Sequence, residues 1–476
     1  MLEICKSFFR YLDDSNIRYC HWKSNEHLLK ALSGKTDLDL LVHEGDMRKF
    51  ENALKKFSIK EVLSPPTKRF PEIYDYLGFD NLSGELIHLH VHYKLVLGQK
   101  YIKNHHLPVE GIIFENLVLK NDIYIPCPEL ELILLIIRAH MKLEVISIIK
   151  HGIKDILNLP YLPFPTEIVN EFKYLLSSIS YNRFSKLLID CNLPINQKIF
   201  LKFISKFSDN KYHFYNAVYI RSRIFSGLRE MRRDKGVAPR LKYILLSLWN
   251  LSAINKLFVI KKKKRLKTNG IILSFVGADG AGKSTLIRDI NRWLSWKLQT
   301  QQYYYGIPKT LTIKIASYVI RYLKKIKQLC VANLIEDILW IYVARKRYKI
   351  CLKSQKNKRN GQIVITDRFP LKEFHSMSVP MDGPRLQTEE SKKKTYFSKL
   401  EKDLYDRIDV PDQIFILQVP LDELRRRKTD LDLISHREKA ESVNSINGSR
   451  VKKIINAEKE YADVFLKIKG LIWDIL

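Results

Sequence analysis

Two kinds of hydrophobic pattern divide the chain into an α/β part, a helical part and a second α/β part. Apolar and polar residues alternate, with the period of a half-buried strand, in residues 37–42 and again in residues 86–93. Between them the pattern predicts a charged helix over about 46–56. From residue 129 to about residue 255 the pattern is helical. From residue 271 onward, short apolar runs alternate with helical segments, which is typical of a parallel sheet covered by helices.

These shifts in pattern predict an α/β fold class with several domains, since 476 residues exceed the length of one ordinary domain. Pro126-Cys-Pro128 punctuates the end of the first part, and the lysine tract that begins at Lys261 precedes the second α/β part. We expect an α/β domain over residues 1–125, a helical domain over 126–260, a basic linker over 261–269 and a doubly wound α/β domain over 270–476. The linker is expected to be solvated, and peripheral contact with a membrane through it stays open.

The net charge indicates which binding partners to expect, and the cysteine content indicates the cellular compartment. Lysine and arginine outnumber acids by 82 to 51, giving a net charge of +31, which favours phosphate-bearing partners, although a bias in codon usage would produce the same composition. The N-terminus lacks the pattern of a signal peptide, and the apolar stretch 241–260 is interrupted by polar residues, so a cytoplasmic protein is expected. The cysteines are scattered without a CxxC pair, which suits a reducing compartment: Cys5, Cys20, Cys127, Cys191, Cys330 and Cys351.

The strongest motif in the sequence is a phosphate-binding loop of the form GxxxxGK[ST], placed between a buried strand and a helix. Glycines allow the backbone to wrap around phosphates, and the following helix adds the positive end of its dipole. The lysine is expected to reach the β- and γ-phosphates of ATP or GTP, and the serine hydroxyl to ligate Mg²⁺. The candidate nucleotide-binding residues are Gly277, Ala278, Asp279, Gly280, Ala281, Gly282, Lys283, Ser284 and Thr285.

The segment 274–285, SFVGADGAGKST, resembles the loop of the thymidylate kinase family. Residues 363–369, IVITDRF, are similar to that family's third strand with its Asp-Arg pair. Residues 414–419, 421–428 and 436–438 are similar to its next strand and basic lid. The resemblance covers about 268–476 and implies a P-loop kinase that uses ATP and Mg²⁺. In that family the acid at the position of Asp279 contacts the sugar of the acceptor.

Phosphoryl transfer between two anions needs positive charge on both sides of the moving group. Arg368 follows a predicted parallel strand, where it can clamp an acceptor phosphate, and Asp367 can hold Mg²⁺ through water or accept a proton. Arg426 and Arg437 are candidate lid residues, so the expected catalytic set is Lys283, Asp367, Arg368, Arg426 and Arg437. The chain departs from the family where Val276 replaces a glutamate and where residues 370–385 replace the segment that seats thymine. A phosphorylated acceptor is expected, and these two departures argue against thymidylate as that acceptor.

Residues 34–42, GKTDLDLLV, resemble the strand of the nucleotidyltransferase superfamily that carries two metal-binding carboxylates. Asp37 and Asp39 share one face of a strand, as joint Mg²⁺ ligation requires. The chain lacks the usual Gly-Ser pair, and the neighbouring strand carries His88, His90 and His92 instead of a third acid. Three imidazoles with two aspartates can bind Zn²⁺ or Mn²⁺, and strand histidines also serve as plain packing residues.

Three functions remain open at this level. The first is a kinase that transfers the γ-phosphate of ATP to a small phosphorylated acceptor, such as a nucleoside monophosphate. The second is a bifunctional nucleotidyltransferase and kinase acting on a sugar or surface-polysaccharide metabolite. The third is an ATP-switched protein that binds polyanions, which predicts steeply salt-dependent binding. We favour the first, without a specific nucleic-acid partner, and a homodimer stays open.

Overall fold

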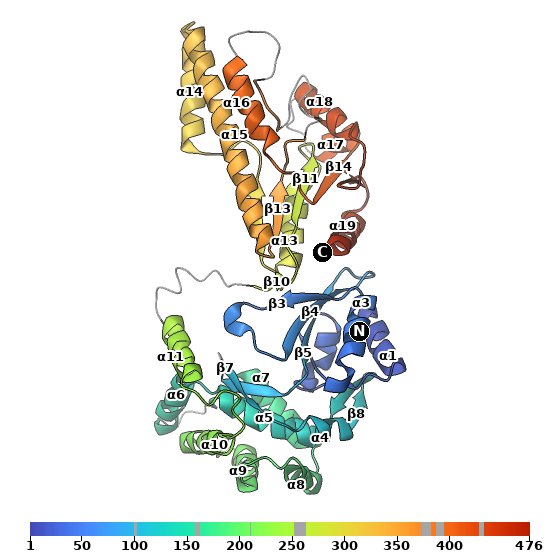
Figure 1. The fold of residues 1–476 in the computed structure, drawn as a ribbon, viewed down its shortest axis with the longest axis vertical. Helices are drawn as coiled ribbons and strands as arrows, with labels where there is room; N and C mark the ends of the chain where they lie inside the picture. Colours follow the sequence, from blue (N-terminus) through green and yellow to red (C-terminus); the bar gives the residue numbers. More distant parts are fainter. Residues whose placement is uncertain are drawn as a thin grey trace. The chain divides into compact units, whose positions relative to one another are not determined.

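The chain folds into two compact units, residues 1–262 and 263–476, referred to below as the N-terminal and C-terminal units (Figure 1). The computed structural model describes residues 1–99, 102–157, 162–209, 211–251, 263–371, 373, 382–386, 395–427 and 433–476.

The first half of the N-terminal unit is a mixed sheet with helices packed on it. Its strands lie in the order β1-β2-β5-β4-β3. Of these neighbouring pairs, β2 and β5 are parallel and the other three are antiparallel. The alternation seen in the sequence corresponds to β2 and β5, and the helix expected over 46–56 is α3. The elements here are α1 (Glu3–Asp14), β1 (Tyr19–His21), α2 (Leu28–Leu32), β2 (Leu38–Val42), α3 (Met47–Lys56), β3 (Lys60–Leu63), β4 (Ile73–Phe79) and β5 (Leu86–His92).

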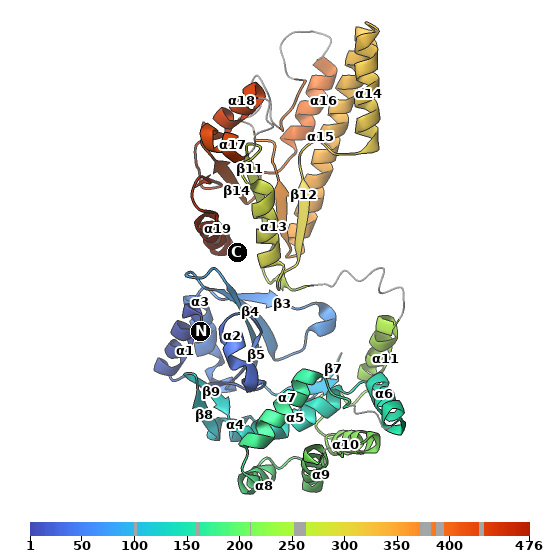
Figure 2. The same ribbon diagram turned by 180° about the vertical axis from the view of Figure 1, so that it is seen from behind.

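Two short antiparallel hairpins follow the sheet, and a helical half completes the unit (Figure 2). The hairpins are β6 (Val96–Gln99) with β7 (Ile102–His106), and β8 (Leu117–Lys120) with β9 (Ile123–Pro126), with α4 (Glu110–Glu115) between them. The helices are α5 (Pro128–Lys142), α6 (Val145–Ile156), α7 (Thr166–Ser178), α8 (Tyr181–Asp190), α9 (Gln197–Ser208), α10 (Phe214–Gly227) and α11 (Ala238–Leu251).

Helix α5 forms the centre of this helical half, because it is buried on every side. Its residues 129–141 are all buried, as expected for a helix surrounded by other helices. Phe172 of α7 and Phe203 of α9 pack against each other at 4.7 Å between ring centroids. Phe203 also meets the rings of His140 and Tyr212. These aromatic contacts join three helices into one core.

The C-terminal unit is built on a five-stranded parallel sheet with the order β12-β13-β11-β14-β15. Every residue of β11 is buried, so both faces of the sheet are covered. On one face Val276 and Ile416 pack with Ala344 of α15, whereas Phe275 and Phe415 stack on each other on the opposite face. The strands are β11 (Ile272–Gly277), β12 (Thr300–Tyr304), β13 (Ile363–Asp367), β14 (Gln413–Gln418) and β15 (Lys452–Asn456).

The helices of this unit alternate with the strands, as the sequence pattern predicted. They are α13 (Lys283–Leu294), α14 (Leu311–Lys325), α15 (Leu329–Arg359), α16 (Thr395–Asp406), α17 (Leu421–Arg427), α18 (Leu433–Asn444) and α19 (Tyr461–Ile475). Helix α13 begins directly after the loop that follows β11. Because the strands are parallel, the carboxyl ends of β11 and β13 lie at the same edge of the sheet, and this edge carries the candidate site.

The basic tract differs in part from the solvated linker expected over 261–269. The Lys264 and Leu266 backbones hydrogen-bond at 3.0 Å to Lys297 and Gly361 within the C-terminal unit. Leu266 is 4% exposed, so its burial holds this segment against the unit. Lys261 and Lys262 lie outside the described residues, as does the end of the apolar stretch 241–260. None of the helices within the described ranges has the length and apolar character needed to cross a membrane.

The aromatic core predicts a large cost for removing its central ring. Phe203→Ala should destabilise the helical half by about 3–5 kcal/mol, because it leaves a cavity between α5, α7 and α9. Leu201→Ala, on the same helix but 43% exposed, should change stability by less than about 1 kcal/mol. Hydrogen exchange of peptides from the three helices, followed by mass spectrometry, reports this half separately. Equal protection in the two variants would contradict the packing described here.

Candidate functional site

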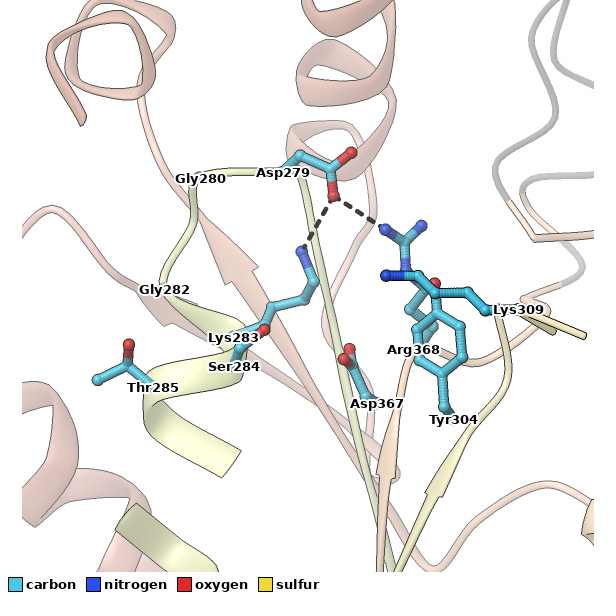
Figure 3. Close-up of a pocket in the computed structure, with 10 residues that line it drawn as sticks. All are labelled: Asp279, Gly280, Gly282, Lys283, Ser284, Thr285, Tyr304, Lys309, Asp367 and Arg368. Atoms are coloured by element: carbon cyan, nitrogen blue, oxygen red, sulfur yellow. Dashed lines mark hydrogen bonds and ion pairs between the residues drawn. The ribbon is translucent and has the colours of Figure 1, made fainter. Parts of the chain in front are cut away.

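A pocket of about 740 Å³ opens at the edge of the C-terminal sheet where β11 and β13 end (Figure 3). Its volume lies in the range typical of small-molecule sites. It is lined by the phosphate-binding loop on one side and by the Asp-Arg pair on the other. The lining residues are Asp279, Gly280, Gly282, Lys283, Ser284, Thr285, Tyr304, Lys309, Asp367 and Arg368.

The loop after β11 adopts the tight turn that the motif predicts. Gly280 and Gly282 have φ angles of +93° and +84°, which residues with a Cβ rarely adopt. Gly282 is the residue before α13, so the positive end of that helix faces the pocket. At Gly277 an added Cβ would lie 3.0 Å from the Leu417 carbonyl oxygen, so the start of the loop also needs a small residue.

The Lys283 ammonium lies inside the curve of the loop. Its Nζ donates to the carbonyl oxygens of Gly277 at 2.9 Å and Ala278 at 2.7 Å, and it lies 3.9 Å from Asp279 Oδ1. The side chain is 7% exposed, and burial lowers the pKa of this ammonium below its ordinary value. A phosphate oxygen would therefore meet a positive group that is already partly desolvated.

The Asp367 carboxylate faces the loop from the end of β13. Its Oδ1 is buried and has no hydrogen-bond partner within the described residues. Burial raises the pKa of this carboxyl, while the nearby Lys283 ammonium opposes the shift. An unpartnered buried carboxylate oxygen has the chemistry of a site for a cation or its water ligands. The Ser284 hydroxyl lines the same pocket and offers a second oxygen ligand.

The Arg368 guanidinium bridges two carboxylates. Its Nη2 lies 2.9 Å from Asp279 Oδ1 and its Nη1 lies 3.2 Å from Asp382 Oδ2. Its backbone φ is +69°, a left-handed conformation that is uncommon for a residue with a side chain and recurs at functional sites. The side chain is 24% exposed. Arg368 therefore reaches the pocket in a fixed position with part of its surface open to a ligand.

Four residues at this site escaped the motif analysis. Asp382 is 4% exposed and also pairs with Arg347, whose Nη2 lies 3.3 Å from Asp382 Oδ1. Arg347 is itself buried on α15 and donates to the Tyr305 carbonyl oxygen. Tyr304 and Lys309 complete the rim, with the Tyr304 ring 5.9 Å from the Arg368 guanidinium. The one signal that the sequence offered was the Asp382-Gly383 pair, which is typical of a turn, since no motif marks the others.

The two lid candidates do not line the pocket in this structure. Arg426 is 81% exposed and lies 3.8 Å from Glu423, and Arg437 is 65% exposed and lies 2.8 Å from Glu441. Both are on helices, α17 and α18, that flank residues 428–432, which lie outside the described part of the chain. Their role in closing over phosphates stays a prediction.

The two aspartates predicted to share a metal in the N-terminal unit pair with different groups. Asp37 Oδ1 lies 2.8 Å from His88 Nδ1, and Asp39 Oδ1 lies 2.7 Å from Lys23 Nζ. The Asp39 carboxylate also lies close to two histidine rings, since ligand atoms of Asp39, His90 and His92 lie within 4.8 Å of one another. Burial opposes ionisation of Asp39, but the Lys23 ammonium lowers the pKa of its carboxyl below the ordinary value.

Comparison with known proteins gives distant similarities. No family model matches the chain. The uncharacterized ATP-binding protein YghR of Escherichia coli K12 is 26% identical over 212 residues, which are 40% of this chain and 83% of that protein, and YghR of E. coli O6:H1 strain CFT073 gives the same values. Among solved structures, thymidylate kinase from Candida albicans is 15% identical, with a TM-score of 0.28, over 44% of this chain and 91% of that one.

Proposed function

We propose that the C-terminal unit is an ATP-dependent kinase that transfers the γ-phosphate to a small phosphorylated acceptor, as nucleoside monophosphate kinases do. The observation that carries this proposal is that one pocket holds a phosphate-binding loop and, facing it, an arginine suited to a second phosphate. In the reaction the bond from the γ-phosphorus to the β,γ-bridging oxygen breaks. A new bond forms to an acceptor phosphate oxygen, and ADP leaves.

The donor side rests on the loop and on Lys283. Backbone N–H groups of the loop and of the first turn of α13 bind the β-phosphate, because they have no partners within the helix. The Lys283 ammonium exchanges its two carbonyl contacts for phosphate oxygens and neutralises charge as the bridging bond breaks. The similarity to YghR, whose name describes it as ATP-binding, supports ATP as a ligand of this chain.

The acceptor side rests on Arg368. A guanidinium binds a phosphate through two parallel hydrogen bonds and so fixes the direction of attack. Asp382 and Asp279 hold this guanidinium in place before the acceptor binds. The Tyr304 ring beside it offers a flat apolar surface for a sugar or base. The acceptor that these groups favour is therefore a phosphate monoester attached to a ring.

The oxygen groups of Ser284 and Asp367 fit Mg²⁺, which prefers oxygen ligands and keeps several waters. Ser284 would hold the ion directly, and Asp367 would hold it through a water. Bound there, Mg²⁺ would supply positive charge to the β- and γ-phosphate oxygens. Asp367 also lies beside Arg368, where its carboxylate can accept a proton from the acceptor.

Activity measurements test the proposal directly. The wild-type chain should release ADP from MgATP faster when one member of a panel of nucleoside monophosphates and phosphosugars is present. Lys283→Ala and Arg368→Ala should each lower that stimulated rate by about 10²-fold or more, because each removes charge that stabilises the transition state.

Arg292→Ala is the matched control, since it removes an arginine that is 79% exposed on α13 and does not line the pocket. Its rate should equal that of the wild type. The kinase proposal is overturned if no acceptor stimulates ADP release, or if Lys283→Ala retains the stimulated rate.

Asp382 is expected to act as a positioning residue for Arg368. Asp382→Asn keeps the shape but weakens the ion pair, so the KM for the acceptor should rise by about tenfold while the KM for ATP changes little. In the Arg368→Ala background the same substitution should have almost no further effect on acceptor kinetics. Steady-state kinetics of the four chains give this double-mutant cycle. Additive effects, or an equal rise in the KM for ATP, would argue against this role.

A further inference from the structure

A second polar cluster lies in the N-terminal unit, on the central strands of its sheet. Ligand atoms of Asp39, His90 and His92 lie within 4.8 Å of one another. The pairing of strands explains this: Asp39 of β2 is the register partner of His90 on β5, and Leu41 is the partner of His92. The alternation of β5 then places His90 and His92 on the same face. Three side chains with metal-ligating atoms therefore converge on one point.

The orientation of His90 is set by a carboxylate behind it. Asp75 of β4 is its register partner on the other side, and His90 Nδ1 donates to Asp75 Oδ1 at 2.8 Å. This bond leaves Nε2 as the ligating nitrogen. A carboxylate that fixes a histidine ring in this way is the usual second layer around a metal. His88, the third histidine of the strand, lies instead between Asp37 and Asp75.

His92 supplies an independent observation. It is 0% exposed, and neither of its ring nitrogens forms a well-aligned hydrogen bond within the described residues, although the Lys94 backbone lies close to the ring. Trp22 packs against its ring at 5.2 Å between centroids. A wholly buried imidazole without a well-aligned hydrogen bond is costly, and a metal ion bound to one of its nitrogens would offset that cost.

We propose that Asp39, His90 and His92 form a binding site for Zn²⁺. Two imidazole nitrogens and one carboxylate oxygen are a donor set for Zn²⁺, whereas Mg²⁺ prefers oxygen ligands alone. Three protein ligands leave a coordination position for water or for an oxygen of a bound molecule, as in catalytic rather than structural zinc sites. This site is separate from the kinase pocket and does not depend on the function proposed for it.

Lys23 provides a second way to test the proposed site, because it pairs with one of the proposed ligands. Its Nζ lies 2.7 Å from Asp39 Oδ1, so an ammonium and a metal ion compete for the same carboxylate. A carboxylate has a second oxygen, which leaves a ligand for the metal while the first is paired. Removing the Lys23 charge should therefore tighten metal binding, whereas removing a ligand should weaken it.

The test is titration of the untagged full chain with Zn²⁺, and then with Co²⁺ as a spectroscopic probe. It uses the Cys330→Ser background, because Cys330 is an exposed thiol that would compete for the metal. We expect one Zn²⁺ per chain that a large excess of Mg²⁺ does not displace. His90→Ala, His92→Ala and Asp39→Asn should each weaken binding by about 10²-fold or more, and Asp75→Asn by about tenfold. Lys23→Gln should strengthen it by about tenfold.

His105→Ala is the matched control. His105 is 5% exposed, and both of its ring nitrogens lack partners within the described residues, yet it lies outside the ligand group. Its Zn²⁺ affinity should equal that of the parent chain. Circular dichroism of each variant checks that it is folded. If His92→Ala misfolds, the conservative substitutions Asp39→Asn and Lys23→Gln still decide the test. Absence of stoichiometric Zn²⁺ binding, or binding that the three ligand substitutions leave within threefold, would overturn the proposal and identify His92 as a packing residue.

Discussion

The ion pair between Arg368 and Asp279 joins the two sides of the pocket, and the rest of the site depends on it. Asp279 belongs to the loop after β11, and Arg368 follows β13, so the pair connects two strands at their carboxyl ends. Asp382 and Arg347 extend the connection to α15. The Arg347 and Asp382 side chains are 3% and 5% exposed, and charges buried this deeply are stable only when they are paired. The two pairs made by Arg368 then hold the loop, the strand end and the helix in one arrangement.

The sheet beneath the pocket supplies the rigidity that this arrangement needs. Both faces of β11 are buried, and the stacked rings of Phe275 and Phe415 lie on the face opposite Val276. A side chain at the end of such a strand moves little, because the strand is hydrogen-bonded on both sides. Polar groups placed just beyond the strand ends are therefore already in position before any ligand binds.

The sequence predicted those parts of the fold and the site that depend on local pattern. The loop 277–285 with its following helix, the strand that ends at Asp367, and strands β2 and β5 all follow from short runs of residues, and the structure has them. Asp382 and Arg347 were missed because they meet across 35 residues without a motif. The sequence analysis grouped the two aspartates of β2 with the three histidines of β5 but could not select Asp39, His90 and His92 among them. The period of β5 gives the face of the sheet, whereas the level along the sheet comes from the pairing of β5 with β2. Alternation cannot predict register.

The contacts of Lys283 with the Gly277 and Ala278 carbonyls have a consequence for selectivity among anions. The ammonium has two carbonyl partners within the loop, so an incoming anion gains only the difference in free energy between its own attraction and theirs. A single inorganic phosphate or sulfate offers few oxygens to make up that difference. A polyphosphate chain also reaches the backbone N–H groups along the loop, and its contacts add up within one molecule. A loop whose lysine contacts its own carbonyl groups therefore favours a polyphosphate chain over a single phosphate or sulfate.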